Sequence, residues 1–187
     1  MRITGGKARG ILLKAPKGRE TRPATDRLRE SVFSSLGSRI EGARVADLFA
    51  GTGAYGLEAM SRGASGGIFV ENSSEVIFCL RENLAAVSKS CGHHSAGGWR
   101  ILAQKIYAIN ASAGLFDVVF IDPPYALIEP KIQTIFSDHI ASITTRESLV
   151  CFEMPGTLEV DIPGWRQVRR LGKTGRDKPT AVFFERD

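Results

Sequence analysis

The chain has 187 residues, 43% of them hydrophobic and 24% charged, with a formal net charge of +5, and this composition excludes a disordered or fibrous protein. No apolar run reaches the length of a membrane span and no signal-peptide pattern is present, so we expect a cytoplasmic protein without a membrane partner. The three cysteines lie far apart and the two adjacent histidines lack a second ligand pair, so neither a disulfide framework nor a metal site is predicted.

Residues 1–25 precede the regular pattern and are rich in glycine and basic residues. The first 30 residues contain nine lysines and arginines against three acidic residues. Short β-like runs between the glycines predict a small basic hairpin or arm, attached to a single domain over 26–187. Concentrated positive charge indicates a polyanion partner, although a solvated surface explains one basic patch equally well.

Helix-like and strand-like segments alternate from residue 26 onward. Apolar spacing predicts helices over 26–36, 74–88 and 129–143, the first of them capped by Thr25 or Asp26. Strands are predicted at 44–49, 67–71, 99–103, 117–122, 148–154, 165–171 and 180–186. The alternation predicts an α/β fold with a mainly parallel sheet and helices on both faces. Only eight residues separate the last two strands, so these should form an antiparallel hairpin.

The run "VADLFAGTGAYGLEA" (45–59) follows an apolar strand and opens a helix. It places Gly51, Gly53 and Gly56 in a G-x-G-x-x-G pattern, the context of a nucleotide-type cofactor on a helix N-terminus. Glu71 ends the next strand, where a carboxylate can accept hydrogen bonds from both ribose hydroxyls. Dinucleotides and S-adenosylmethionine both fit this arrangement.

Asp47, on the first strand, helps to separate the two cofactor classes. An acid beside the glycine turn is unfavourable for a pyrophosphate. S-adenosylmethionine carries an ammonium and a sulfonium group instead, so a carboxylate near the turn favours it.

The run "DVVFIDPPYALIEP" (117–130) carries a strand directly into Asp122, Pro123 and Pro124. Proline fixes φ and lacks the backbone N–H, and the residue before it is pushed toward extended conformations. The strand therefore ends in a stiff segment that has free carbonyls and few donors. Such a segment suits a site that must accept hydrogen bonds.

Together, "DLFAGTGAYGLEA", "FVE" and "VVFIDPPY" resemble the Rossmann-like, S-adenosylmethionine-dependent methyltransferases that modify exocyclic amino groups of bases. The resemblance implies a class I fold with a seven-stranded sheet. An amino nitrogen whose lone pair is delocalised must become more tetrahedral before it can attack, and acceptors on its N–H groups favour this geometry. The resemblance implies that the Asp122 carboxylate and the Pro123 carbonyl are these acceptors, that Pro124 removes a competing donor, and that Tyr125 stacks on the extracted base.

The opening "RITGGKARGILLKAP", followed by "TRPATDRLRESVFSSL", resembles the RsmD family of bacterial rRNA guanine-N2 methyltransferases. This resemblance implies methyl transfer to the exocyclic N2 of one guanine of the 966 type in 16S rRNA, within a small-subunit assembly particle. It implies cofactor contacts from Asp47, Phe49, Gly51, Gly53, Glu71 and Gln104. It implies RNA contacts from Lys7, Arg9, Arg22 and Arg29.

Three other functions remain open on the sequence. The first is an adenine-N6 or guanine-N2 methyltransferase that acts on DNA or another RNA, although the chain has no room for a separate DNA-recognition domain. The second is a nicotinamide oxidoreductase, which leaves the Asp-Pro-Pro-Tyr segment unexplained. The third is a non-catalytic RNA-binding module, which leaves Asp47, Glu71 and Asp122 without a role.

Overall fold

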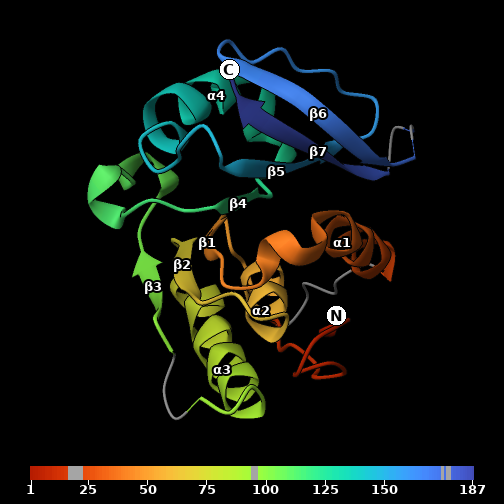
Figure 1. Ribbon diagram of the computed structural model, residues 1–187, viewed down its shortest axis with the longest axis vertical. Helices are drawn as coiled ribbons and strands as arrows, with labels where there is room; N and C mark the ends of the chain where they lie inside the picture. The colour runs from red at the N-terminus through yellow and green to blue at the C-terminus, as the bar shows by residue number, and fades with distance from the viewer. Residues whose placement is uncertain (17–22, 94–96, 174, 176–177) are drawn as a thin grey trace.

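Seven strands form a single sheet in the computed structural model, which describes residues 1–16, 23–93, 97–173, 175 and 178–187 (Figure 1). The strands are β1 Arg44–Leu48, β2 Gly66–Glu71, β3 Trp99–Ala103, β4 Val118–Ile121, β5 Leu149–Pro155, β6 Trp165–Gly172 and β7 Pro179–Arg186. Their spatial order is β3-β2-β1-β4-β5-β7-β6. Each strand end lies within one residue of its predicted position, so the predicted Rossmann-like sheet is confirmed.

Strands β1 to β5 are parallel, so their carboxyl ends meet at one edge of the sheet. The strand order reverses direction at β1, which pairs with β2 on one side and with β4 on the other. Ligands of open α/β sheets bind outside the carboxyl ends of the strands at such a switch point. The topology therefore predicts a site where β1 and β4 end.

The last two strands form the predicted antiparallel hairpin. β7 is inserted between β5 and β6 and runs antiparallel to both. A register shift between Gln167 and Arg169 marks a bulge in β6, the edge strand. A bulge and several charged side chains on an exposed edge oppose pairing with another chain.

Helices cover both faces of the sheet, as predicted (Figure 1). α1 Pro23–Leu36, α2 Ala54–Ser61 and α3 Ser74–Ser90 lie on one face. α4 Ile128–Thr134 lies on the other. Because side chains alternate along a strand, Val118 and Phe120 of β4 pack toward the first group of helices, whereas Val119 and Ile121 pack toward the second.

The first and last predicted helices differ from the structure in detail. α1 begins at Pro23, so Asp26 lies inside its first turn and forms an ion pair with Arg29 rather than capping the helix. The helix predicted over 129–143 begins at Ile128 and changes after Thr134 into a π-helix over Ile135–Ile140. A π-helix bonds residue i to i+5, which aligns Ile135 with Ile140, and both are fully buried.

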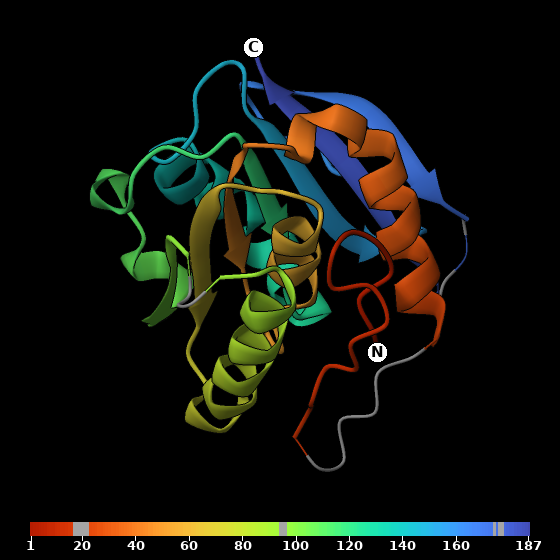
Figure 2. The same ribbon diagram turned by 60° about the horizontal axis from the view of Figure 1, so that its bottom comes forward.

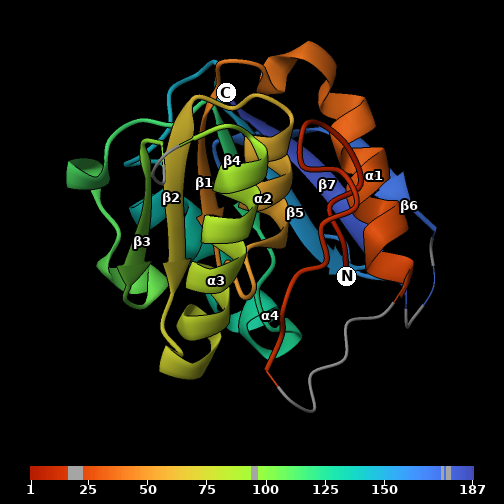
Figure 3. The same cartoon turned by 90° about the horizontal axis from the view of Figure 1, so that it is seen from below.

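The N-terminal arm packs against the helices of the first face (Figures 2 and 3). It turns back on itself through one isolated antiparallel bridge between Arg2 and Leu12, so the predicted hairpin forms without regular strands. Ile3, Ala8 and Leu13 are buried in the same core cluster as the helices. Part of the arm is thus integral to the core.

Candidate active site

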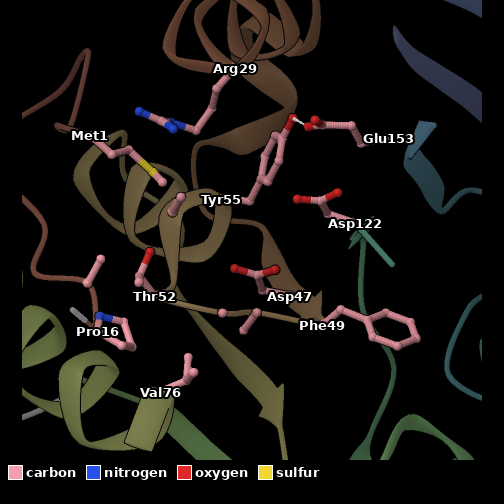
Figure 4. Close-up of a pocket in the computed structure, with 14 residues that line it drawn as sticks. Met1, Pro16, Arg29, Asp47, Phe49, Thr52, Tyr55, Val76, Asp122 and Glu153 are labelled. Carbon is pink, nitrogen blue, oxygen red and sulfur yellow. Dashed lines mark hydrogen bonds between the residues drawn. The ribbon is translucent and has the colours of Figure 1, made fainter. Parts of the chain in front are cut away.

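A cavity of about 250 Å³ opens at the carboxyl edge of the sheet, where β1 and β4 end. Its walls come from separate parts of the chain: the arm, α1, the turn after β1, the end of β4, and β5. Figure 4 shows these side chains around one space. The residues on which its chemistry depends are Asp47, Phe49, Thr52, Tyr55, Asp122 and Glu153.

The turn after β1 depends on uncommon backbone conformations. Gly53 has a φ of 88°, and a Cβ atom there would lie 2.4 Å from the Leu80 side chain. A Cβ atom on Gly56 would lie 2.3 Å from the ring of Phe69. Phe49 has a φ of 61°, the only positive value for a non-glycine residue in the part of the chain that the structure describes. Such strain in a bulky residue persists mainly at functional sites, which points to this turn as a ligand site.

Asp47 is an almost fully buried acid at the end of β1. Its Oδ2 atom accepts a hydrogen bond of 2.8 Å from the backbone N–H of Gly56. Burial raises the pKa of Asp47 to about 8, and the Glu71 carboxylate acts in the same direction, whereas the Gly56 N–H and the Arg29 guanidinium oppose it. A cation that enters the cavity therefore favours the charged form of Asp47.

We expect the affinity for a cationic ligand of this cavity to rise with pH. Below about pH 8 the free protein holds a proton on Asp47, and a bound ammonium or sulfonium group releases it. Calorimetry with S-adenosylmethionine should show proton release and a gain of up to about tenfold in affinity per pH unit from pH 6 to 8. The Asp47→Asn variant should lose this dependence. A slope that survives in Asp47→Asn would assign it to another group.

A second cavity of about 240 Å³ lies beyond Phe49, which lines both spaces. Glu71 lies in its wall, where Oε2 accepts from the N–H of Gly51 at 3.0 Å and Oε1 accepts from the N–H of Asn72 at 2.8 Å. Gln104 also lines this cavity, as do the apolar side chains of Val70, Ile106 and Leu127. A carboxylate and an amide beside an apolar space can hold a ribose and a purine ring.

The Asp-Pro-Pro-Tyr segment begins where β4 ends at Ile121. Pro124 is extended, with φ −52° and ψ 131°, and a 3₁₀ turn over Tyr125–Leu127 follows. Pro123 is buried, whereas Asp122 is exposed to solvent, and the Asp122 side chain lines the first cavity (Figure 4). The stiff segment thus holds a carboxylate at the cavity wall, beside the glycine turn.

Glu153 of β5 and Tyr55 of α2 complete the cavity, and the sequence analysis missed both. The Tyr55 hydroxyl donates a 2.7 Å hydrogen bond to Glu153 Oε2 (Figure 4). The surrounding protein raises the pKa of Asp122 well above its usual range, and the Glu153 and Asp47 carboxylates add to this effect. The overlooked signal was an acid within the apolar run "SLVCFEM".

Glu58 fastens the arm to α2. It is fully buried, and its carboxylate accepts from the N–H groups of Thr4 and Gly5 at 2.8 Å each. It also pairs with Arg29 at 3.4 Å and with Arg62 at 2.8 Å. Arg29 was predicted to meet RNA, but its side chain is only 2% exposed and is engaged by this network. In the structure it holds the arm and faces the cavity.

Asn83 joins the arm to the glycine turn. Its side chain is 2% exposed, accepts from the N–H of Lys14 at 2.8 Å, and donates to the carbonyl groups of Lys14 and Thr52 at 3.0 Å each. Met1 and Pro16 of the arm line the first cavity. The arm is therefore a wall of the candidate site.

Lys7 and Arg9 are exposed and lie at the other end of the helices. The Lys7 N–H donates to the carbonyl of Ser61, the last residue of α2, and its own carbonyl accepts from Ser90, the last residue of α3. These helix ends lie away from the strand ends that carry the cavity. Arg22, the remaining predicted RNA contact, lies outside the described residues.

Neither a metal cluster nor a membrane-spanning helix is found within the described ranges. No group of three or more histidine, cysteine, aspartate or glutamate side chains there is arranged to hold a metal ion. No helix there is both long and apolar enough to cross a bilayer.

Comparison with known sequences gives one consistent family. The model of the family described as Conserved hypothetical protein 95 matches residues 1–181. The chain is 38% identical over 135 residues to Ribosomal RNA small subunit methyltransferase D of Escherichia coli, covering 71% of this chain and 65% of that protein. It is 36% identical over 140 residues to YlbH of Bacillus subtilis, provisionally named an rRNA methyltransferase, covering 73% and 72%. The match thus spans about two thirds of these relatives.

Solved structures show the same architecture over the whole chain. The chain matches yhhF of Escherichia coli, provisionally named a methyltransferase, with a TM-score of 0.78 and 31% identity, covering 100% of this chain and 98% of that one. A structure from Haemophilus influenzae, provisionally named a methylase, matches with a TM-score of 0.75 and 25% identity, covering 99% of this chain and 97% of that one. These likenesses include the arm as well as the sheet.

Proposed function

Because this chain belongs to the Conserved hypothetical protein 95 family, the family of the RsmD methyltransferases, we propose that it transfers a methyl group from S-adenosylmethionine to the exocyclic N2 of a guanine in 16S rRNA. The proposed target is a loop guanine of the 966 type, in a small-subunit assembly particle. Loop bases are the ones that a protein can extract from RNA and read.

One juxtaposition carries the proposal: Asp122 and the glycine turn face the same cavity. Asp47 and Phe49 belong to the turn that would hold the methyl donor, and Asp122 ends the neighbouring strand β4. A base amino group bound to Asp122 would thus lie next to the donor. An oxidoreductase has no use for an acceptor-rich Asp-Pro-Pro-Tyr segment at this place.

The residues of the two cavities suit the separate parts of S-adenosylmethionine. Asp47 suits the positively charged end, and Glu71 with Gln104 suits the adenosine in the second cavity. Phe49 lines both cavities, so one extended ligand can occupy them together. When bound, S-adenosylmethionine supplies a methyl group whose bond to sulfur breaks as the bond to nitrogen forms.

Asp122 would first position the attacking nitrogen and then accept a proton from it. Its carboxylate and the Pro123 carbonyl would accept hydrogen bonds from the amino group, which favours the geometry of attack and stabilises developing positive charge. After transfer, the nitrogen carries one proton too many. The N–H groups of the bound base would favour the ionised form of Asp122, which could then accept this proton because the surrounding protein and the Glu153 and Asp47 carboxylates raise its pKa. Tyr125, half exposed beside Asp122, would stack on the base.

Basic residues would hold the rRNA backbone over a long footprint. We assign phosphate contacts to Lys7, Arg9 and Arg22, as the family resemblance implies. Lys7 contacts the C-terminal end of α3, a helix of 17 residues, so the footprint would extend on the order of 25 Å from the cavity. Such contacts would make binding depend strongly on salt.

The proposal is tested by labelling. Purified protein and tritiated S-adenosylmethionine would be incubated with small ribosomal subunits, naked 16S rRNA and genomic DNA, all from bacteria that lack this enzyme. Digestion to nucleosides should place the label in N2-methylguanosine from the small subunit. Sequencing by reverse-transcription arrest would then locate the guanine.

Each other outcome has a definite meaning. Label in N6-methyladenosine or in DNA would keep the methyltransferase and reject the guanine target. Equal labelling of naked rRNA and of the particle would reject the assembly particle as the required substrate. Transfer to none of the three, with no binding of S-adenosylmethionine by calorimetry, would reject the function altogether.

A further inference from the structure

Two carboxyl groups stand side by side at the ends of β4 and β5. The parallel register pairs Ile121 with Phe152, so the next residues, Asp122 and Glu153, are neighbours. Side chains alternate along strands, and Phe120 and Cys151 pack toward the face of α1 and α2. Asp122 and Glu153 follow them by two residues and therefore project to that same face, where both line the first cavity (Figure 4). Adjacent strands lie about 4.8 Å apart, which sets the spacing of the pair.

Glu153 is held in one orientation by Tyr55. The Tyr55 ring packs in a cluster of three aromatic rings, with its centroid 4.9 Å from that of Phe120 and 6.3 Å from that of Phe33, and this packing fixes the position of its hydroxyl. This hydroxyl engages Glu153 Oε2. Glu153 Oε1 makes no further hydrogen bond among the described residues. The carboxylate thus keeps an acceptor available to the cavity although only 6% of the residue is exposed.

A buried carboxylate beside a second carboxylate is unfavourable for the folded protein unless a ligand donates hydrogen bonds to the pair. Burial raises the pKa of Glu153, whereas the Tyr55 hydrogen bond and the Arg29 guanidinium act in the opposite direction. Satisfying one tyrosine hydroxyl does not require a charged partner. The pair of acids therefore suits a ligand that presents two adjacent N–H donors.

Guanine has this pair of donors on its Watson–Crick edge, where N1–H lies next to the N2 amino group. Adenine has an acceptor at N1 instead, which a carboxylate repels. We propose that Glu153 accepts a hydrogen bond from N1–H of the target guanine while Asp122 holds the N2 amino group. Glu153 is then the residue that selects guanine over other purines. This inference rests on the proposed function and adds to it the residue that reads the base.

The test exchanges the base and the residue together. Matched 16S rRNA substrates, made by ligating synthetic segments, would carry guanine or 2,6-diaminopurine at the target. Both bases have the N2 amino group, but only guanine has N1–H. The wild-type protein should prefer guanine by about 10- to 100-fold in kcat/KM, as for loss of a hydrogen bond to a charged group.

The Glu153→Gln variant should lose this preference or reverse it. Its amide oxygen can still accept from Tyr55, while its NH₂ group now faces N1, which suits 2,6-diaminopurine and repels guanine. Guanine and 2,6-diaminopurine also differ in the group at C6. Measuring both bases with both proteins cancels the effect of this difference, because it is the same for each protein. Glu159→Gln, a change at an exposed residue that pairs with Arg170, is the matched control and should keep the wild-type ratio.

Two results would overturn the assignment. If Glu153→Gln slowed both substrates by the same factor, Glu153 would be structural only. If the wild-type protein used both bases equally, N1–H would not be read. This comparison uses only the wild-type protein, so it does not depend on whether a variant folds. Failure of the proposed function itself looks different: the wild-type protein would then methylate neither substrate at N2.

Discussion

Replacing Asp122 by alanine is expected to reduce the single-turnover rate of methyl transfer by about 10²–10³-fold, the usual effect of deleting one preorganised contact to a transition state. The affinity for S-adenosylmethionine should stay within a few-fold of wild type, because the residues assigned to the cofactor belong to other segments. Rapid-quench kinetics on the rRNA substrate and calorimetry with the cofactor measure the two effects separately.

Two further variants sharpen this prediction. Asp122→Asn retains one acceptor oxygen and should keep more activity than Asp122→Ala. Neither substitution should destabilise the protein. Each removes a carboxyl group whose pKa is raised by the surrounding protein and by Glu153, and the charged form of such a group is unfavourable in the folded state. If Asp122→Ala lost cofactor affinity and rate by the same factor, Asp122 would be assigned to binding the cofactor and not to the amino group of the base.

Replacing Glu58 by alanine is expected to lower the free energy of unfolding by about 3–5 kcal/mol, the range for removing one partner of a buried ion pair. The change leaves Arg29 buried without this partner and removes the acceptor for the N–H groups of Thr4 and Gly5. Urea unfolding gives the stability. Hydrogen exchange of the arm amides should show residues 3–5 opening before the sheet.

A surface pair provides the control for Glu58. Glu82 pairs with Lys14 of the same arm, but both side chains are partly exposed. Glu82→Ala should therefore change the stability by no more than about 1 kcal/mol. If both variants were equally stable, the arm would be held by its apolar side chains, Ile3 and Leu13, and not by the network around Glu58.

The sheet could be predicted from the sequence because its signals are local. Buried parallel strands appear as short apolar runs, and the glycine turn and the Asp-Pro-Pro segment carry their backbone constraints in neighbouring residues. Those signals identified Asp47, Glu71 and Asp122, and the structure places all three around two adjoining cavities.

The remainder of the site depends on pairs that are distant in the chain. Tyr55 and Glu153 are 98 residues apart, and Thr4 and Glu58 are 54 apart, so no local pattern joins them. Arg29 illustrates the limit: the family resemblance implied a contact with RNA, but the side chain is buried beside Glu58. A polar residue inside an apolar run, such as Glu153, was the signal that could have been used.

The long separations also determine when the cavity can form during synthesis. The arm leaves the ribosome first, but its acceptor Glu58 follows 54 residues later, about 3–10 s at usual rates of elongation. During this time Ile3 and Leu13 lack part of the core cluster in which they are buried in the folded protein. Glu153 follows Tyr55 by 98 residues, and β7 must still enter between β5 and β6. The cavity is therefore among the last parts to take shape, and a nascent chain that stops before β5 lacks its pair of acids.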